Sequence, residues 1–502
     1  MPRLALIPLD ERPVNVRYPQ LIAQIADAEL RVPPAALLSR KRAPADCDAL
    51  IAWLHTQAAA CDALIVSLDM LAYGGLIASR TTDEPAARCL ARLERLRAMP
   101  RSGAIYAFNV IARIPDADDS VEEPEYWAHY GRRLHRYSQL LHRAAEGQAV
   151  VSELSALQAE IPEAYRADFL RRRLRNHQVN LAALDLLAQG VFDLLVISSD
   201  DTSPYGLGSQ EKAWLSEWRR RLQLADSVLM YPGADEIGCV LTVRALLERV
   251  QRTPRFYVHY AIPEDSARVA PYEDGAVSLT VERQIRAIGG VLVAREDEAE
   301  FIVAVNPPSR IGAELDFSPE AYTAEQAYRA APMAAFAEQI AAWLSAARRV
   351  ILCDVAYPNG SDPFLMAQLF AQADVRQLAA YGAWNTAGNT IGTALAQGVA
   401  SATVQTPQQA HAQQYFLAHR FVEDYLYQQG VRAEVRAWLA ARAGVPEVSP
   451  EREAETCAYI ERRLNEQLAA LSQLGAQWRV AHGSVRLPWQ RTFEVDFDLE
   501  SV

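Results

Sequence analysis

Short aliphatic runs alternate along the chain with longer stretches in which apolar residues recur at helical spacing. Each run is followed by polar or glycine-rich residues and then by a helical pattern, which is typical of parallel strands connected by helices. The clearest runs are RLALIPL, DALIVSL, AIYAFNV, DLLVISS, SVLMYPG, RFYVHYA, EFIVAVN, RVILCDV and QLAAYGA, and ELRVP and GVLVA are weaker additions.

This alternation predicts an α/β fold, and we expect a TIM-like (β/α)8 barrel with a helical insertion and a helical C-terminal region. A barrel wall needs only eight strands, so at least one of the nine clear runs must lie outside it. The surplus allows an alternative, in which two doubly wound, Rossmann-like lobes divide near Thr253.

Two segments have helical periodicity without strand-like runs. Residues of about 114–190 separate two predicted strands and are expected to form a helical insertion over the strand ends. After about residue 400 the pattern is helical again, and it ends in a possible strand, RTFEVDFDL. We therefore predict an α/β catalytic domain over residues 1–400 and a mainly helical region over residues 401–502.

Composition narrows the class of protein. The chain has 502 residues, of which half are hydrophobic, and its 62 acidic and 50 basic residues leave a net charge of -12. This charge disfavours general binding to nucleic acid or to anionic membranes. A charge comes too early for a secretory signal, and no apolar run reaches the roughly 18 residues of a membrane span. We expect a cytoplasmic protein without nucleic-acid or membrane partners, and its oligomeric state stays open.

Lysine is rare, because Lys41 and Lys212 are the only two in the chain. A Schiff-base enzyme would have to use one of them. Lys41 lies in the polar run SRKRAP, and Lys212 lies in QEKAWLSEWRRRL, which has the pattern of an amphipathic surface helix. Neither position favours a catalytic role.

Polar and aromatic residues gather after the predicted strands, where parallel α/β folds bind their ligands. Any one of them is explained as a helix cap or a turn residue. As a set, carboxylates, amides and aromatic rings suit a ligand rich in hydroxyl groups, such as a carbohydrate. The candidate substrate-binding residues are Asp10, Arg12, Asn15, Asp69, Tyr73, Asn109, Arg113, Tyr205, Asp235, Glu236, Asn306, Asp354, Asn359, Trp384, Asn385 and Asn389.

Other common chemistries lack their motifs. There is no GxxxxGK[ST] for nucleotides, no GxSxG for an esterase and no HExxH for zinc, so we expect no cofactor and assign no metal ligand. Two alternatives stay open. A magnesium site made only of carboxylates would use Asp10, Asp69, Asp200 and Asp354. An anionic ligand such as a sugar phosphate would use Arg12, Arg80 and Arg113.

The stretch DLLVISSDDTSPYG ends a predicted strand in two adjacent carboxylates, Asp200 and Asp201. They either cap the following helix or do acid-base work in a pocket. Neighbouring residues of a regular strand point to opposite faces, so both can reach one pocket only where the strand has ended. The following Thr202, Ser203 and Pro204 agree with such an end.

The motifs LIPLDERPVN, SLDMLAYGGLIASR, ISSDDTSPYG, YPGADEIG, GAWNTAGNTIG and LPWQRTFEVDF resemble the bacterial family catalogued as domain of unknown function 4127, over nearly the whole chain. That family implies no settled activity. In the order of its motifs the chain also resembles glycosidases of the O-GlcNAc hydrolase and bacterial hyaluronidase type. In those enzymes an Asp-Asp pair follows the fourth barrel strand, a position that ISSDDTSPYG matches here, and CDVAYPNGSD and AYGAWNTAGNTIGTALAQ are similar to later motifs.

The second resemblance implies a glycoside hydrolase that acts on a 2-acetamido sugar conjugate by a substrate-assisted mechanism. Asp200 would then polarise the acetamido group, and Asp201 would be the general acid. Adjacent carboxylates push their proton affinities apart, which suits such a division of roles. The alternatives are a metal- or phosphate-dependent sugar isomerase or lyase, and a non-catalytic sugar-binding protein.

Overall fold

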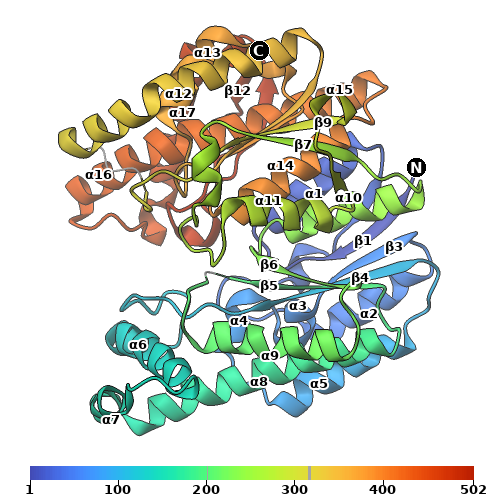
Figure 1. Cartoon of the computed structure of the whole chain (residues 1–502), viewed down its shortest axis with the longest axis vertical. Coiled ribbons are helices and arrows are strands. Elements are labelled where there is room, and N and C mark those ends of the chain that lie inside the picture. Colours follow the sequence, from blue (N-terminus) through green and yellow to red (C-terminus); the bar gives the residue numbers. More distant parts are fainter. Residues whose placement is uncertain (201, 315–317) are drawn as a thin grey trace. The chain divides into compact units, whose positions relative to one another are not determined.

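The computed structural model describes residues 1–200, 202–314 and 318–502. The chain forms two compact units, each with its own parallel sheet (Figure 1). Unit 1 comprises residues 1–16, 28–241 and 272–274, and unit 2 comprises residues 17–27, 242–271 and 275–502. Among the residues described, no helix combines the length and apolar character that crossing a membrane requires.

Unit 1 is built on a six-stranded parallel sheet with the order β2-β1-β3-β4-β5-β6. Strands β3 and β5 are buried along their whole length, which explains why they appear in the sequence as unbroken aliphatic runs. The strands are β1 (Arg3–Ile7), β2 (Glu29–Arg31), β3 (Ala63–Ser67), β4 (Ala104–Ile111), β5 (Leu194–Ser199) and β6 (Val228–Pro232).

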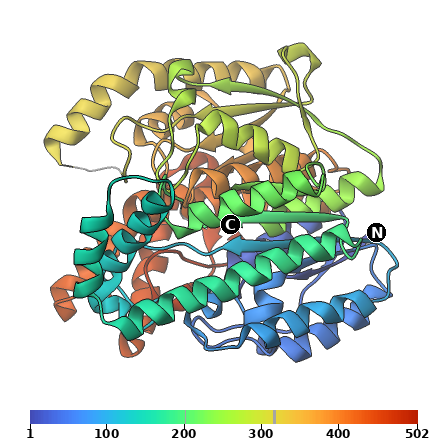
Figure 2. The same ribbon diagram turned by 60° about the horizontal axis from the view of Figure 1, so that its bottom comes forward.

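The helices of unit 1 cover this sheet and extend past its end. The long helix α8 packs against β4 and β5, and α6 and α7 pack on each other beyond the strands (Figure 2). The helices are the start of α1 (Pro13–Ile25, of which residues 17–25 belong to unit 2), α2 (Cys47–Ala58), α3 (Leu68–Tyr73), α4 (Leu76–Thr81), α5 (Ala86–Glu94), α6 (Trp127–Ala145), α7 (Val151–Glu160), α8 (Glu163–Ala188), α9 (Leu207–Arg221) and the start of α10 (Ile237–Arg249), with 3-10 turns at Ala35–Leu37 and Arg95–Ala98.

Unit 2 is built on a five-stranded parallel sheet with the order β11-β10-β9-β7-β8, and β12 and β13 form a separate antiparallel pair. Its strands are β7 (Arg255–Tyr260), β8 (Val291–Leu292), β9 (Phe301–Asn306), β10 (Arg349–Asp354), β11 (Ala380–Gly382), β12 (Trp478–Val480) and β13 (Leu499–Ser501).

The helices of unit 2 surround a large apolar core, and α14 packs on β10 and β11. Helix α15 continues through a π-helix into α16. The helices are α11 (Val277–Ala287), α12 (Pro319–Ser345), α13 (Pro363–Gln372), α14 (Ala387–Ser401), α15 (Pro407–Arg420), the π-helix (Phe421–Val431), α16 (Arg432–Ala443), α17 (Glu453–Ala470) and α18 (Ser472–Gly475), with 3-10 turns at Pro263–Ala267, Glu296–Glu298, Val375–Gln377, Pro450–Arg452 and Pro488–Gln490.

The structure confirms all eleven predicted runs as strands, but it does not confirm the single barrel. Strands β6 and β7 belong to different parallel sheets, so the alternative with two sheets fits. Counted along each unit, the sheet of unit 2 has the order 2-1-3-4-5, and the sheet of unit 1 has the same order with a sixth strand added at its end. The order 2-1-3-4-5 is common in doubly wound folds. The expected strand RTFEVDFDL is wrong for most of its length, because β13 begins only at Leu499.

Candidate functional site

The candidate residues are divided between the two units. Asp201 lies outside the described residues. Unit 1 contains Asp10, Arg12, Asn15, Asp69, Tyr73, Asn109, Arg113, Asp200, Tyr205, Asp235 and Glu236. Unit 2 contains Asn306, Asp354, Asn359, Trp384, Asn385 and Asn389.

Unit 1 has a cavity of about 410 Å³ beyond the carboxyl ends of β4 and β5. This volume lies in the usual range for small-molecule sites, which is roughly 300 to 1,000 Å³. Three of the candidates, Arg113, Asp200 and Tyr205, line it. Further side chains come from helix α6, the start of α9 and residues 272–274. The additional polar lining residues are Asp116, His135, Ser138, Ser199, Thr202, Ser203, Ser209, Lys212, Tyr272 and Asp274.

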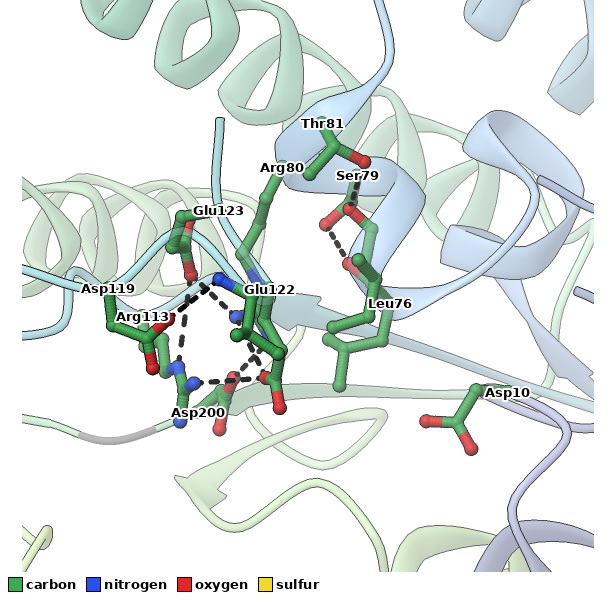
Figure 3. Close-up of polar contacts among 12 residues, drawn as sticks. Asp10, Leu76, Ser79, Arg80, Thr81, Arg113, Asp119, Glu122, Glu123 and Asp200 are labelled. Atoms are coloured by element: carbon green, nitrogen blue, oxygen red, sulfur yellow. Dashed lines mark hydrogen bonds and ion pairs between the residues drawn. The ribbon is translucent and has the colours of Figure 1, made fainter. Parts of the chain in front are cut away.

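Asp200 lies directly after β5 and forms an ion pair with Arg80 of helix α4 (Figure 3). Arg80 Nη2 lies 3.2 Å from Asp200 Oδ2, and Arg80 Nη1 lies 2.7 Å from Glu123 Oε1. Burial by itself lowers the pKa of Arg80, but the carboxylates of Glu123, Asp200 and Glu122 outweigh it and the pKa is raised. Asp200 therefore faces a fixed positive charge, which favours its ionised form.

Arg113 extends this network toward the cavity. Its Nη2 donates to Glu122 Oε2 at 3.0 Å, and its Nε lies 4.0 Å from Glu123 Oε1. Figure 3 shows Arg80 and Arg113 among Glu122, Glu123 and Asp200. Glu123 is buried, which raises its pKa, although both arginines oppose that rise. The loop after β4 thus places Glu122 and Glu123 near the strand ends, where their carboxylates bind both arginines.

Asp69, near the start of helix α3, interacts electrostatically with Arg80 and Asp200 of this network. Its Oδ2 accepts a hydrogen bond of 2.9 Å from the backbone N–H of Val110. Burial raises the pKa of Asp69 to about 7, against the backbone hydrogen bonds and Arg80, while the negative charge of Asp200 adds to the rise. The charge of Asp200 therefore acts on the protonation of the buried Asp69.

Helix α6 of the insertion positions the loop that follows Asp200. Ser138 Oγ accepts from the backbone N–H of Leu207 at 2.7 Å, and His142 Nδ1 accepts from Gly206 N–H at 3.2 Å. The ring of Tyr205 lies under Arg143, with 4.6 Å between the guanidinium carbon and the ring centroid. The insertion therefore helps to shape the cavity.

His135 lies in the cavity wall with a hydrogen bond on each ring nitrogen. Its Nδ1 lies 2.7 Å from the carbonyl oxygen of Ile114, and its Nε2 lies 3.0 Å from Gln139 Nε2. A proton on Nδ1 satisfies the carbonyl and leaves Nε2 to accept from the amide. This arrangement holds the ring in place, which fits a structural role better than that of a general base.

Sequence reasoning missed several residues at this site. Lys212 lines the cavity and lies 2.6 Å from Asp274, and Tyr272 comes from the same distant segment. The scarcity of lysine was a signal for Lys212, but its helical pattern suggested a surface role. No local signal marked Glu122 and Glu123, because their partner Arg80 is some forty residues away in sequence.

The family comparison agrees with the sequence motifs. A family model described as "Protein of unknown function (DUF4127)" matches residues 4–498. The chain belongs to the DUF4127 family. Searches of the curated proteins and of the solved structures find no match to the chain. The predicted family membership is thereby confirmed, and the resemblance to glycosidases stays a prediction.

A second candidate group in this DUF4127 protein is a buried ion-pair cluster at the ends of β1 and β6. Arg12 Nη2 lies 2.7 Å from Asp10 Oδ2 and 2.5 Å from Asp235 Oδ1. Asn15 Nδ2 donates to both carboxylates, at 2.9 and 3.1 Å. Burial raises the pKa of Asp235 in spite of Arg12. Figure 3 shows Asp10 apart from Asp200, so these candidates form their own group.

The remaining candidates of unit 1 are packed inside the fold. Tyr73 is buried with Arg175 over its ring at 4.8 Å, and Asn109 donates to Asn180 of helix α8. Glu236 is fully buried at the start of α10. Over the residues described, no three His, Cys, Asp or Glu side chains lie close enough to hold a metal ion.

The candidates of unit 2 in the DUF4127 protein also separate into groups. Asn306 and Asp354 belong to a fully buried network with Arg329 and Asp362. Asn359 lines a cavity of its own. The others surround the start of helix α14: Trp384 is buried 6.1 Å from the ring of Phe493, Asn385 accepts a 3.2 Å hydrogen bond from Asn359 N–H, and Asn389 is buried within α14.

Proposed function

We propose that this DUF4127 protein is a glycoside hydrolase that binds a 2-acetamido sugar conjugate in the cavity of unit 1. The observation that carries the proposal is the position of Asp200. It follows β5, lines the cavity and is paired with the buried Arg80. A carboxylate held in this way has the charge that a substrate-assisted reaction needs at the acetamido group.

The reaction assigns a separate role to each aspartate. The acetamido oxygen attacks the anomeric carbon and forms a cyclic intermediate, while Asp200 accepts the acetamido N–H and stabilises the positive charge that develops. The bond to the leaving oxygen breaks as Asp201 gives that oxygen a proton. Water then opens the intermediate, with Asp201 taking the proton back. The role of Asp201 rests on the sequence alone.

The rest of the cavity suits a sugar ring. Tyr205 and Tyr272 contribute aromatic residues to the cavity lining, and Ser203 and Ser209 contribute hydroxyl-bearing residues. Sugars present apolar C–H faces between hydroxyl groups, so they bind to aromatic rings and polar groups together. The cavity is large enough for a small conjugate.

A second function has its own support. Arg113 and Lys212 both line the cavity, so a sugar phosphate or another anion would find two cations there. This favours an isomerase or lyase that acts on a sugar phosphate. Asp116, Asp200 and Asp274 line the same cavity, which opposes a dianion and makes this function the weaker of the two.

The test is hydrolysis of nitrophenyl glycosides with and without a 2-acetamido group. We expect release only from 2-acetamido sugars, and loss of this activity in both Asp200→Asn and Asp201→Asn. Asp116→Asn is the matched control, because Asp116 lines the same cavity without a role in the reaction. Equal rates on both sugar types, or full activity in Asp200→Asn, would contradict the proposal. Turnover of sugar phosphates that Lys212→Gln abolishes would establish the second function instead.

A further inference from the structure

Unit 2 contains a cavity of about 480 Å³ that the proposed hydrolase does not use. One wall is the loop that follows β10, and the opposite wall is the end of the π-helix with the first turn of α16. Its lining residues are Glu314, Tyr357, Pro358, Asn359, Gly360, Ser361, Gln428, Gln429, Arg432, Ala433 and Arg436.

Both walls have unusual backbone. Asn359 has a φ of +55°, in the left-handed region, and its N–H donates to the carbonyl of Asn385, where φ is +63°. Such conformations cost about 1 kcal/mol or more outside glycine and are concentrated at functional sites. The π-helix Phe421–Val431 is an uncommon element that is also frequent at functional sites. Its residues Gln428 and Gln429 face the cavity.

The cavity wall holds buried polar atoms without a protein partner among the described residues. Asn359 Nδ2 donates to Glu314 Oε1 at 2.8 Å, which fixes the orientation of the amide, and its Oδ1 is left without a donor. The Oε1 of Gln429 also lacks a donor, and Arg432 Nε lacks an acceptor. A buried polar group left without a partner costs about 1 to 3 kcal/mol. A ligand that supplies two hydrogen-bond donors and one acceptor would satisfy all three atoms.

The charges in this cavity favour an anion. Arg432 and Arg436 both line it, and Glu314 is the acidic residue in the described lining. Arg432 Nη1 lies 3.9 Å from Glu314 and donates to Gln428 Oε1 at 3.2 Å. Burial lowers the pKa of Arg432, and the positive charges of Arg436 and Arg491 lower it further, against Glu314. One carboxylate therefore does not offset the positive charge at this wall.

We propose that this cavity is a binding site for a small hydroxylated carboxylate, such as a sugar acid. The carboxylate accepts from the guanidinium of Arg432, whose planar donors match two oxygens, and from Arg436. Hydroxyl groups donate to Asn359 Oδ1 and Gln429 Oε1. A carboxylate suits the cavity better than a phosphate dianion, because Glu314 repels the second charge. The site does not depend on the hydrolase activity of unit 1.

The test is calorimetric titration of the full-length protein with glucuronate, glucose and glucose 6-phosphate. Glucuronate is expected to bind at least tenfold more tightly than the other two. Arg432→Gln should weaken its binding at least tenfold. Asn359→Gly should weaken binding too, and it retains the positive φ, so this variant tests the site even where Arg432→Gln does not fold.

Two control variants test whether glucuronate binds at this site rather than at arginines elsewhere in the chain. Arg442→Gln changes an exposed arginine of the same helix α16, and Arg113→Gln changes a cation of the unit 1 cavity. Both should bind glucuronate as the wild type does. Absence of glucuronate binding, equal binding of glucose, tighter binding of glucose 6-phosphate, or loss of binding in Arg113→Gln rather than Arg432→Gln would each overturn the proposal. None of these results depends on glycoside turnover.

Discussion

The two sheets both end in aspartates, but the surroundings of these aspartates differ. Asp200, after β5, has a side chain that is 17% exposed and lines a cavity, and it forms an ion pair with Arg80. Asp354, at the end of β10, is 0% exposed and accepts from Asn306 and from the backbone N–H of Asp362. The same residue type at the same place in a parallel sheet therefore lines a cavity in one unit and belongs to a fully buried polar network in the other.

The network around Asp354 explains this difference. Arg329 of helix α12 is fully buried, and its Nε lies 2.7 Å from Asp362 Oδ2. It also donates to Asn306, which in turn donates to Asp354 at 2.8 Å. The network thus links α12, the ends of β9 and β10, and the start of α13. Buried charges are tolerated when they are paired and hydrogen-bonded in this way.

Breaking the buried network should have the largest effect on stability. We expect Arg329→Met to lower the free energy of unfolding by about 3 to 5 kcal/mol, because it leaves buried carboxylates without their cation. Urea or guanidinium denaturation measures this. The matched control is Arg220→Met, since Arg220 is 72% exposed and its ion pair with Glu217 should contribute less than about 1 kcal/mol. Similar losses in both variants would contradict the contrast between the two regions.

Asp200 should show the opposite behaviour. Asp200→Asn is expected to lower the rate on a 2-acetamido glycoside by about 10² to 10⁴-fold, the range for a catalytic group of this kind. Its unfolding free energy should fall by less than in Arg329→Met, because Arg80 keeps its ion pairs with Glu122 and Glu123 when Asp200 loses its charge. A large loss of stability with unchanged activity would mean that Asp200 resembles Asp354.

The free energy of unfolding should depend on pH through Asp69. Burial raises its pKa to about 7 in the folded protein, against about 3.9 in an unfolded chain. Between these values the folded state holds a proton that the unfolded state has released. Its contribution to stability is therefore fully present below pH 4 and is lost as the pH rises toward 7.

Asp69→Asn removes this titration while leaving an oxygen to accept from Val110 N–H. Between pH 4 and 7, the stability of the variant relative to the wild type should increase by up to about 1.4 kcal/mol per pH unit. Denaturation midpoints measured across this range provide the check. Parallel curves for the two proteins would show that Asp69 does not titrate there.

The sequence predicted the strands well because strand formation depends on local pattern. Strands β3 and β5 are buried on both faces, so each appears as an aliphatic run. Whether β6 pairs with β7 depends on contacts between distant segments, and local periodicity is the same in a barrel and in two sheets. For this reason the elements were predictable and their closure into one sheet or two was not.

The candidate site was predictable only in part, for a related reason. Strand-end position selected Asp200 and Arg113, which do line a cavity, but it also selected Asp10 and Asp354, which are buried in ion-pair networks. Asp10 is paired with Arg12, only two residues away, whereas Arg329, which pairs with Asp362 in the network around Asp354, comes from another helix. Solvent access and pairing are tertiary properties, and the spacing of residues in sequence does not encode them.

We expect Lys212→Gln to have the smallest effect of these variants, and it tests most directly whether the ligand is charged. The ion pair of Lys212 with Asp274 is partly exposed, so Lys212→Gln should change the unfolding free energy by less than about 1 kcal/mol. With a neutral 2-acetamido glycoside, KM should rise less than with an anionic sugar, because the neutral sugar loses at most a hydrogen bond to the ammonium, whereas the anion also loses an ion pair. Steady-state kinetics with neutral and anionic sugars measure this. A much larger rise in KM, confined to an anionic substrate, would show that the cavity selects for negative charge and would favour the sugar-phosphate enzyme.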